Sequence, residues 1–213
     1  MPSWARGAVR RRLWTTLLPV ALIASACGAG RRASPEASST SQSQPPAALL
    51  AEARPIGRGA AFQPPARGPV DGRCGKSLGP RFGVHVEVFA ANRVVLIPAG
   101  IGTRPPRSYS SGRIARAGCY GQLVTLDPTG VVLTRPGADL ELGALFKAWG
   151  QPLGAGRLLS FPAPSGAQVR VFVDGRRWRG PPDRVPLSRH AEIVVEVGPY
   201  VPPHAAYTFP PGV

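Results

Sequence analysis

Apolar and polar side chains alternate in several short stretches between residues 71 and 200, and this alternation predicts strands that each bury one face. In the first stretch, three valines alternate with His85 and Glu87 over Val84–Phe89. Similar stretches follow at Arg93–Ile97, Cys119–Leu126, Val131–Arg135, Val169–Val173, Arg176–Trp178 and Glu192–Val197. The sequence therefore predicts a sheet of short strands, most of them joined as hairpins.

Turn residues separate these stretches. Asp127–Gly130 reads DPTG, which has the residues that a type I turn prefers at its first, second and fourth positions. Asp174-Gly175 lies between two apolar stretches and predicts a tight hairpin turn. Pro98–Arg116 is rich in Gly, Pro and Ser, so we expect a loop there.

The period changes once, between residues 139 and 150. Four large apolar side chains recur at helical spacing: Leu142, Leu145, Phe146 and Trp149. Asp139 is the expected N-cap, and Gly150 followed by Pro152 is expected to end the helix. These elements predict an α+β fold, a small and mostly antiparallel sheet of hairpins with one packed helix. The segment from Cys119 onward has a β-grasp-like ββαββ order, although other α+β arrangements fit short hairpins around one helix.

The N-terminal segment has the three parts of an export signal. A start with four arginines precedes an apolar stretch, Leu13–Ile23, which is too short to anchor in a bilayer. Small residues and Cys27 follow, so we predict a signal peptide over residues 1–26 and a lipid anchor, palmitate included, on Cys27. An ordinary signal peptide cut near Ala26 is the alternative, and Arg10–Trp14 also resembles a twin-arginine signal.

Composition divides the rest of the chain. Residues 27–70 are rich in Ala, Ser, Pro, Gly and Gln without a sustained apolar period, which predicts a disordered tether. The α+β domain is expected over residues 71–200, and residues 201–213 form a Pro-rich tail of extended coil, in which His204 is expected to be solvated. If Cys27 carries lipid, Cys74 and Cys119 remain, and an even remainder in an exported protein predicts a disulfide. Two buried free thiols are the alternative.

The chain is strongly basic, with a net charge of +15. Four of its 26 basic residues and none of its 11 acidic residues lie before Cys27, so the mature chain carries +11. Only Lys76 and Lys147 are lysines, so much of the charge reflects a composition rich in Arg, Ala, Gly and Pro. The expected partners are the membrane, through the lipid, and an acidic envelope polymer or another envelope protein. Nucleic acid is not expected for an exported chain.

Five motifs in order resemble those of an uncharacterised family of bacterial exported proteins. They read VLIPAGIG, DPTGVV, ELGALFKAWGQPL, VFVDGRRW and PLSRHAEIVVEVG, and the similarity covers roughly Asp71–Gly198. The hallmarks of that family are a VPAGIG segment, an LHTHD…GxIHIE segment, a TLGQFFDVWGQPL helix and a VNG hairpin. The resemblance implies export but no assigned reaction.

The family carries alternating histidines that suit a metal site, because residues i and i+2 share a strand face. Here the LHTHD stretch reads Leu123–Asp127 without histidine, and His85 with Glu87 is what remains of the first cluster. The candidate metal ligands are therefore His85, Glu87 and His190, an incomplete set, or His190 is a loop residue that bonds to backbone. No cofactor is expected.

No catalytic set of nucleophile, base and acid is recognisable, so we do not expect an enzyme. The densest basic cluster contains Arg170, Arg176, Arg177 and Arg179. It suits a phosphate, a carboxylated polymer or an acidic partner, or it is a solvated hairpin edge. The sequence predicts a membrane-anchored lipoprotein that acts as a non-enzymatic binding module. The alternative is a copper- or zinc-handling envelope protein with a degenerate histidine site.

Overall fold

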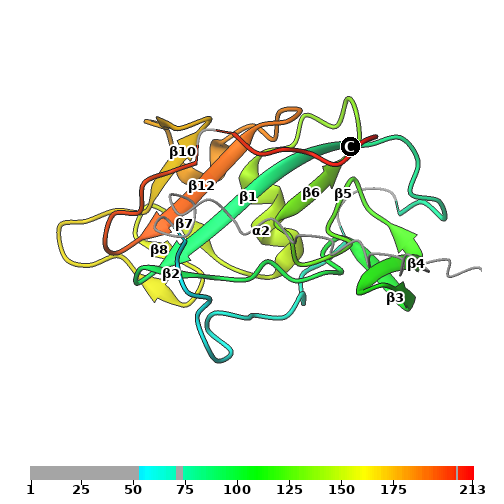
Figure 1. Cartoon of the computed structure of the whole chain (residues 1–213), viewed down its shortest axis with the longest axis horizontal. Helices are drawn as coiled ribbons and strands as arrows, with labels where there is room; N and C mark the ends of the chain where they lie inside the picture. Colours follow the sequence, from blue (N-terminus) through cyan, green and yellow to red (C-terminus); the bar gives the residue numbers. More distant parts are fainter. Residues whose placement is uncertain (1–52, 71–73, 205) are drawn as a thin grey trace, which may run out of the picture. The chain divides into compact units, whose positions relative to one another are not determined.

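The central strand of the main sheet is β1 (Phe82–Ala90) in the computed structural model, which describes residues 53–70, 74–204 and 206–213. β1 pairs in parallel with β12 (Glu192–Val197) and antiparallel with β6 (Val131–Thr134). The full order is β11-β10-β12-β1-β6-β5, with β2 also paired to β1 (Figure 1). The remaining bounds in this sheet are β2 Arg93–Val94, β5 Leu123–Val124, β10 Arg170–Val173 and β11 Arg176–Arg177. All described residues belong to one unit, Pro45–Val213.

The topology confirms the α+β prediction and places the β-grasp-like part differently. The four central strands run β10-β12-β1-β6, with two antiparallel pairs on either side of the parallel β1–β12 pair. Helix α2 (Leu142–Trp149) lies between the two antiparallel pairs in sequence. This is a β-grasp order, but its first pair is β1 with β6. The prediction that the order starts at Cys119 was wrong.

Helix α2 packs its apolar stripe against the inner face of the sheet. Leu145, Phe146 and Trp149 are almost fully buried and share one core with alternate residues of β1 and β12. Burying one such side chain contributes about 1.5–3 kcal/mol, so this layer is the main source of stability. The helix begins after Glu141, not at the predicted Asp139 cap, and it ends at Gly150 as predicted, with a φ of 79°.

A second, two-stranded sheet lies outside the main one, where we expected a loop. Strands β3 (Thr103–Ser110) and β4 (Arg113–Tyr120) pair antiparallel, and most of their side chains are exposed. The predicted strand Cys119–Leu126 is accordingly divided, because β4 ends at Tyr120 and β5 begins at Leu123. A small third sheet follows the helix and contains β7 Leu153–Gly154, β8 Arg157–Leu158 and β9 Phe161–Pro162.

The predicted disulfide is present between Cys74 and Cys119, whose Cα atoms are 5.5 Å apart. It joins the segment before β1 to the outer hairpin strand β4. Such a bond is consistent with an extracytoplasmic location, since cytosolic thiols are kept reduced. None of the helices within the described ranges combines the length and the apolar character that spanning a bilayer requires.

The folded domain begins before the predicted boundary at residue 71. The N–H of Leu96 donates to the Phe62 carbonyl at 2.9 Å, and the buried indole Nε1 of Trp149 donates to the Pro64 carbonyl at 3.0 Å. Phe62 also packs against the main core. The packing of Phe62 and the hydrogen bonds to the carbonyls of Phe62 and Pro64 hold this Pro-rich stretch on the domain. The stretch has no periodic apolar pattern, so the sequence did not indicate this packing. The predicted signal peptide and Cys27 lie outside the described residues.

The outer face of the main sheet is covered by the C-terminal segment, of which residues 199–204 and 206–213 are described and drawn in orange-red to red in Figure 1. Val201 is buried and its N–H donates to the Glu196 carboxylate at 2.8 Å, while Tyr207 stacks on His85. The tail is therefore extended, as predicted, but it packs on the domain. This covering explains why all six residues of β12 are buried, although its alternation predicts one solvated face.

Candidate functional site

A row of polar side chains lies on the outer face of the sheet, beneath the C-terminal segment. Parallel pairing puts His85 of β1 opposite Glu192 of β12, and Glu87 follows two residues later on the same face. One ligand atom from each of these three residues lies within 4.8 Å of the others. Apolar clusters flank the row on both sides, around Leu133 and around Phe172. The row is thus a polar site between two apolar clusters of the outer face.

His85 is held in one orientation by three contacts. Its Nε2 lies 3.0 Å from the Thr129 carbonyl oxygen, and its Nδ1 lies 2.7 Å from Oε2 of Glu192. The ring of Tyr207 stacks on the imidazole, with centroids 3.7 Å apart. Because a carbonyl oxygen only accepts, Nε2 is the nitrogen that carries a proton. Nδ1 therefore faces the carboxylates of Glu87 and Glu192. A hydrogen bond between Nδ1 and Glu192 needs a proton in addition to the one on Nε2, carried either by Nδ1 or by the Glu192 carboxyl group.

Glu192 is a carboxylate with 1 % of its surface exposed. Its Oε1 has no hydrogen-bond partner among the described residues, while Oε2 bonds to His85. Burial raises the pKa of Glu192 above its ordinary value of 4.5, and the charge of Glu87 acts in the same direction. The hydrogen bond to His85 and the charges of His85 and His204 act to lower it.

Glu87 links the row to the C-terminal segment. Its Oε2 lies 2.8 Å from Nδ1 of His204, and both side chains are partly exposed. His204, which we expected to be solvated in the tail, keeps part of its side chain in solvent but is also held by this contact. Two histidines and two glutamates from three separate parts of the chain come together here.

His190, the third predicted ligand, does not join this group. Its Nε2 lies 2.7 Å from the carbonyl oxygen of Val213, and its ring packs against Phe209. It is exposed and bonds to backbone, as its alternative reading predicted. Glu192 takes its place beside His85. The sequence carries a weak signal for this, because Glu192 and His85 occupy equivalent alternating positions, but the parallel pairing that joins them leaves no trace in a local pattern.

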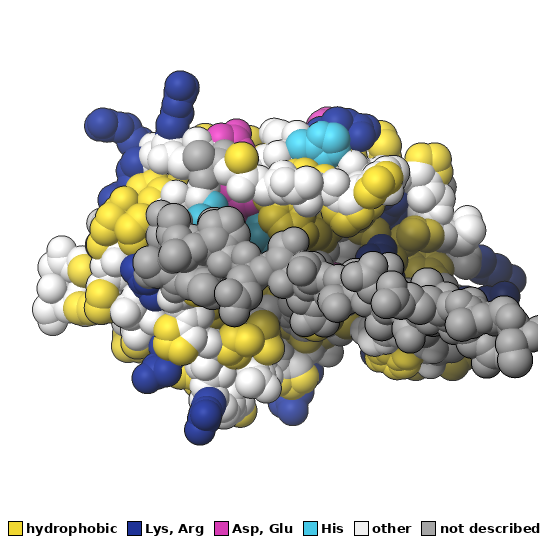
Figure 2. All heavy atoms as spheres, viewed as in Figure 1, with side chains coloured by type: hydrophobic (Ala, Val, Ile, Leu, Met, Phe, Trp, Pro, Cys, Tyr) yellow, Lys and Arg dark blue, Asp and Glu magenta, His cyan; other side chains and the backbone are white. Residues whose placement is uncertain are grey.

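The four arginines of the predicted basic cluster lie in three different places. Arg170 forms a half-buried ion pair with Glu196 at 2.5 Å and donates to the Gly198 carbonyl, so it belongs to the outer face of the sheet. Arg177 and Arg179 flank Trp178 and line a cleft of about 700 Å³, whose other residues include Gln168, Pro181 and Asp183. Arg176 is exposed at the β10–β11 turn. On the face shown in Figure 2, basic side chains project at separate points around the outline.

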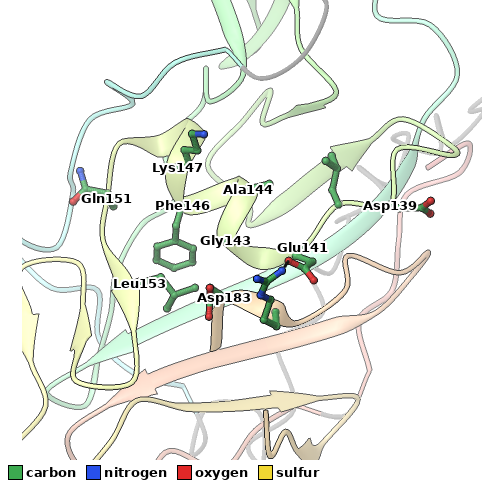
Figure 3. A pocket seen from close by; sticks show the side chains of 11 residues that line it. Asp139, Glu141, Gly143, Ala144, Phe146, Lys147, Gln151, Leu153 and Asp183 are labelled. Carbon is green, nitrogen blue, oxygen red and sulfur yellow. Dashed lines mark hydrogen bonds and ion pairs between the residues drawn. The ribbon is translucent and has the colours of Figure 1, made fainter. Parts of the chain in front are cut away.

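A second cleft of about 580 Å³ lies between helix α2 and the short helix η1 (Pro182–Arg184). Figure 3 shows Phe146 and Leu153 close together at this cleft. Glu141 and Arg184 also line it. These two charges form an ion pair at 3.2 Å with both side chains largely in solvent. An exposed pair of this kind contributes little, and the cleft contains none of the predicted ligands.

No protein-family profile, curated protein or solved structure matches this chain. The resemblance to the exported family therefore stays a prediction.

Proposed function

We propose that this chain is an exported lipoprotein whose domain binds an anionic envelope polymer without catalysing a reaction. The observation that carries the proposal is the cleft in which Arg177 and Arg179 flank Trp178. Guanidinium groups bind carboxylates and phosphates through paired hydrogen bonds, and an indole adds a flat surface for an apolar part of the ligand. Both arginines are exposed, so a polymer can reach them without unfolding the domain.

The position of the cleft on the molecule supports a binding role. β11 contains Arg177 and is the edge strand of the main sheet, so the cleft lies at the border of a rigid layer. Trp178 is fixed by a hydrogen bond from its Nε1 to the Pro181 carbonyl at 3.1 Å, and its N–H donates to Val171. Two charges on a fixed backbone lose less conformational freedom on binding than charges on a mobile loop.

Anchoring through Cys27 and cleavage of residues 1–26 are part of the same proposal. The net charge of +11 beyond residue 26 favours contact with anionic lipids and polymers of an envelope. If the anchor is correct, cells fed labelled palmitate will label the wild-type chain, and a Cys27→Ser variant will lose both the label and its place in the membrane fraction.

The test of the cleft is a binding titration of the full chain with poly-L-glutamate and, separately, with polyphosphate. The double variant Arg177→Ala/Arg179→Ala should weaken binding at least fivefold. The matched control is Arg104→Ala/Arg116→Ala, which removes the same charge from exposed positions of the β3–β4 hairpin. It should change binding less than twofold.

Two outcomes would overturn the proposal that the polymer binds in this cleft. Equal losses in both double variants would mean that net charge, and not this site, attracts the polymer. No binding of the wild-type chain to either polymer at moderate salt would remove the proposal altogether.

A further inference from the structure

We propose that His85, Glu87 and Glu192 form a binding site for a divalent transition-metal ion, with zinc as the reference ion and His204 beside it as an additional donor. The site is separate from the cleft of Arg177 and Arg179. The ligand atoms of the first three residues already lie within 4.8 Å of one another.

The orientation of His85 is that of a metal ligand. Histidines that bind metals usually donate their other ring N–H to a carbonyl or carboxylate, which fixes the ring and its tautomer. Here Nε2 lies 3.0 Å from the Thr129 carbonyl oxygen, and Tyr207 stacks on the ring. The lone pair of Nδ1 in the neutral ring therefore points at the carboxylates.

The buried carboxylate of Glu192 is the second and independent observation. Its side chain is almost completely buried, and Oε1 has no partner among the described residues, although such an oxygen normally has one. Glu87 adds a second carboxylate nearby. A cation between them would satisfy the oxygen and offset the repulsion of two adjacent negative charges.

The donor set selects the class of ion. Imidazole nitrogen with carboxylate oxygen suits zinc and neighbouring transition metals, whereas calcium and magnesium prefer oxygen alone. Zinc lies about 2.1 Å from such ligands, so tetrahedral ligands are about 3.4 Å apart. Small side-chain rotations of Glu87 and Glu192 would close the present spacing. His204, 2.8 Å from Glu87, is placed either to complete the shell or to orient that carboxylate.

The competing explanation is that the row of His85, Glu87 and Glu192 has only a structural role. The same hydrogen bonds fasten the C-terminal segment to the sheet, and this role needs no ion. The two explanations differ in whether Glu192 and His85 control metal affinity.

The test is a titration of the full chain, purified without a histidine tag and stripped with EDTA, with Zn²⁺, and with Ca²⁺ for comparison. The wild-type chain should bind one zinc ion far more tightly than calcium. Glu192→Gln keeps the size of the side chain and should weaken zinc binding at least tenfold, as should His85→Ala. His190→Ala is the matched control, because His190 also contacts the C-terminal segment but lies outside the group.

Substitution with Co²⁺ provides a second readout, since the visible spectrum of a site with nitrogen and oxygen ligands should appear in the wild-type chain and be lost in Glu192→Gln. If His85→Ala fails to fold by circular dichroism, Glu192→Gln and Glu87→Gln decide the question. No zinc binding at 100-fold excess over protein would overturn the proposal. So would zinc binding that Glu192→Gln leaves unchanged, or that His190→Ala abolishes.

Discussion

At residue 192, burial and charge oppose each other. Alternation in β12 puts Glu192 and Glu196 on the outer face, where the C-terminal segment excludes water from both. Glu196 is compensated by Arg170 and the N–H of Val201. Within the described part of the chain, the Glu192 carboxylate bonds to His85 through Oε2, and its Oε1 has no partner. A buried carboxylate with one unpaired oxygen costs stability, so Glu192 lowers the stability of the fold unless a further partner satisfies that oxygen.

The raised pKa of Glu192 predicts a pH dependence of stability with a definite sign. In the folded chain without metal, the carboxyl holds its proton to higher pH than in the unfolded chain, where the pKa is near 4.5. The folded state then binds more protons, so the free energy of unfolding falls as pH rises through this interval, by about 1.4 kcal/mol for each pH unit between the two pKa values.

Urea denaturation in EDTA at several pH values, for wild type and Glu192→Gln, measures this effect. The stability of the variant relative to wild type should increase from pH 4 upward and level off above the raised pKa. The groups that face Glu192 are His85, Glu87 and His204, and all three are present in both proteins. A relative stability that is constant, or that decreases with pH, would contradict the prediction.

At the scale of elements, the packing of the C-terminal segment on the outer face of the sheet is a feature that the sequence pattern does not indicate. Its contacts with the domain include those of Val201 with Glu196, His204 with Glu87, Tyr207 with His85, and Phe209 and Val213 with His190. Tyr207 and Val213 also pack on the apolar cluster around Leu133. A chain that ends at Gly198 would expose this cluster and the polar row.

We therefore expect truncation after Gly198 to lower the free energy of unfolding by roughly 2–4 kcal/mol, since it removes the buried Val201 and exposes the outer clusters. Thermal and urea denaturation would measure the loss. Thr208→Ala, at an exposed position of the same segment, is the control and should change stability by less than about 0.5 kcal/mol. A truncated chain as stable as the full one would show that the segment does not cover the sheet in solution.

Elements with a strong local pattern were the ones that sequence predicted well. Helix α2 follows from the spacing of Leu142, Leu145 and Trp149, and the β10–β11 turn at Asp174-Gly175 has both residues at positive φ, as that dipeptide favours. The β3–β4 hairpin was missed because its side chains are mostly exposed arginine, proline and serine, so no apolar alternation marks it.

The polar row could be predicted only in part. His85 and Glu87 share a strand, and their spacing of two predicts a common face. Glu192 lies 107 residues from His85, and its approach depends on parallel pairing across the whole fold. His204 comes from a Pro-rich stretch whose packing rests on single contacts with no period.

At the scale of the whole molecule, the disulfide fastens the segment before β1 to the outer hairpin. Cys74 and Cys119 are 45 residues apart, and closing such a loop restricts the unfolded chain by roughly 3–4 kcal/mol in the entropic account. Cys74→Ser/Cys119→Ser should lower the free energy of unfolding by about that amount in urea. Wild type in excess reductant is the parallel measurement, and it should agree. A loss below about 1 kcal/mol in both would contradict the expected stabilisation through restriction of the unfolded chain.

The proposed function places polymer binding in the basic cleft at the edge of the main sheet. Hydrogen–deuterium exchange of the full chain, with and without a saturating anionic polymer, locates the contact directly. The account predicts that slowed exchange is concentrated at residues 176–184, around Trp178, and disappears in Arg177→Ala/Arg179→Ala. Protection of the β3–β4 hairpin instead, or an equal slight slowing over the whole surface, would contradict it.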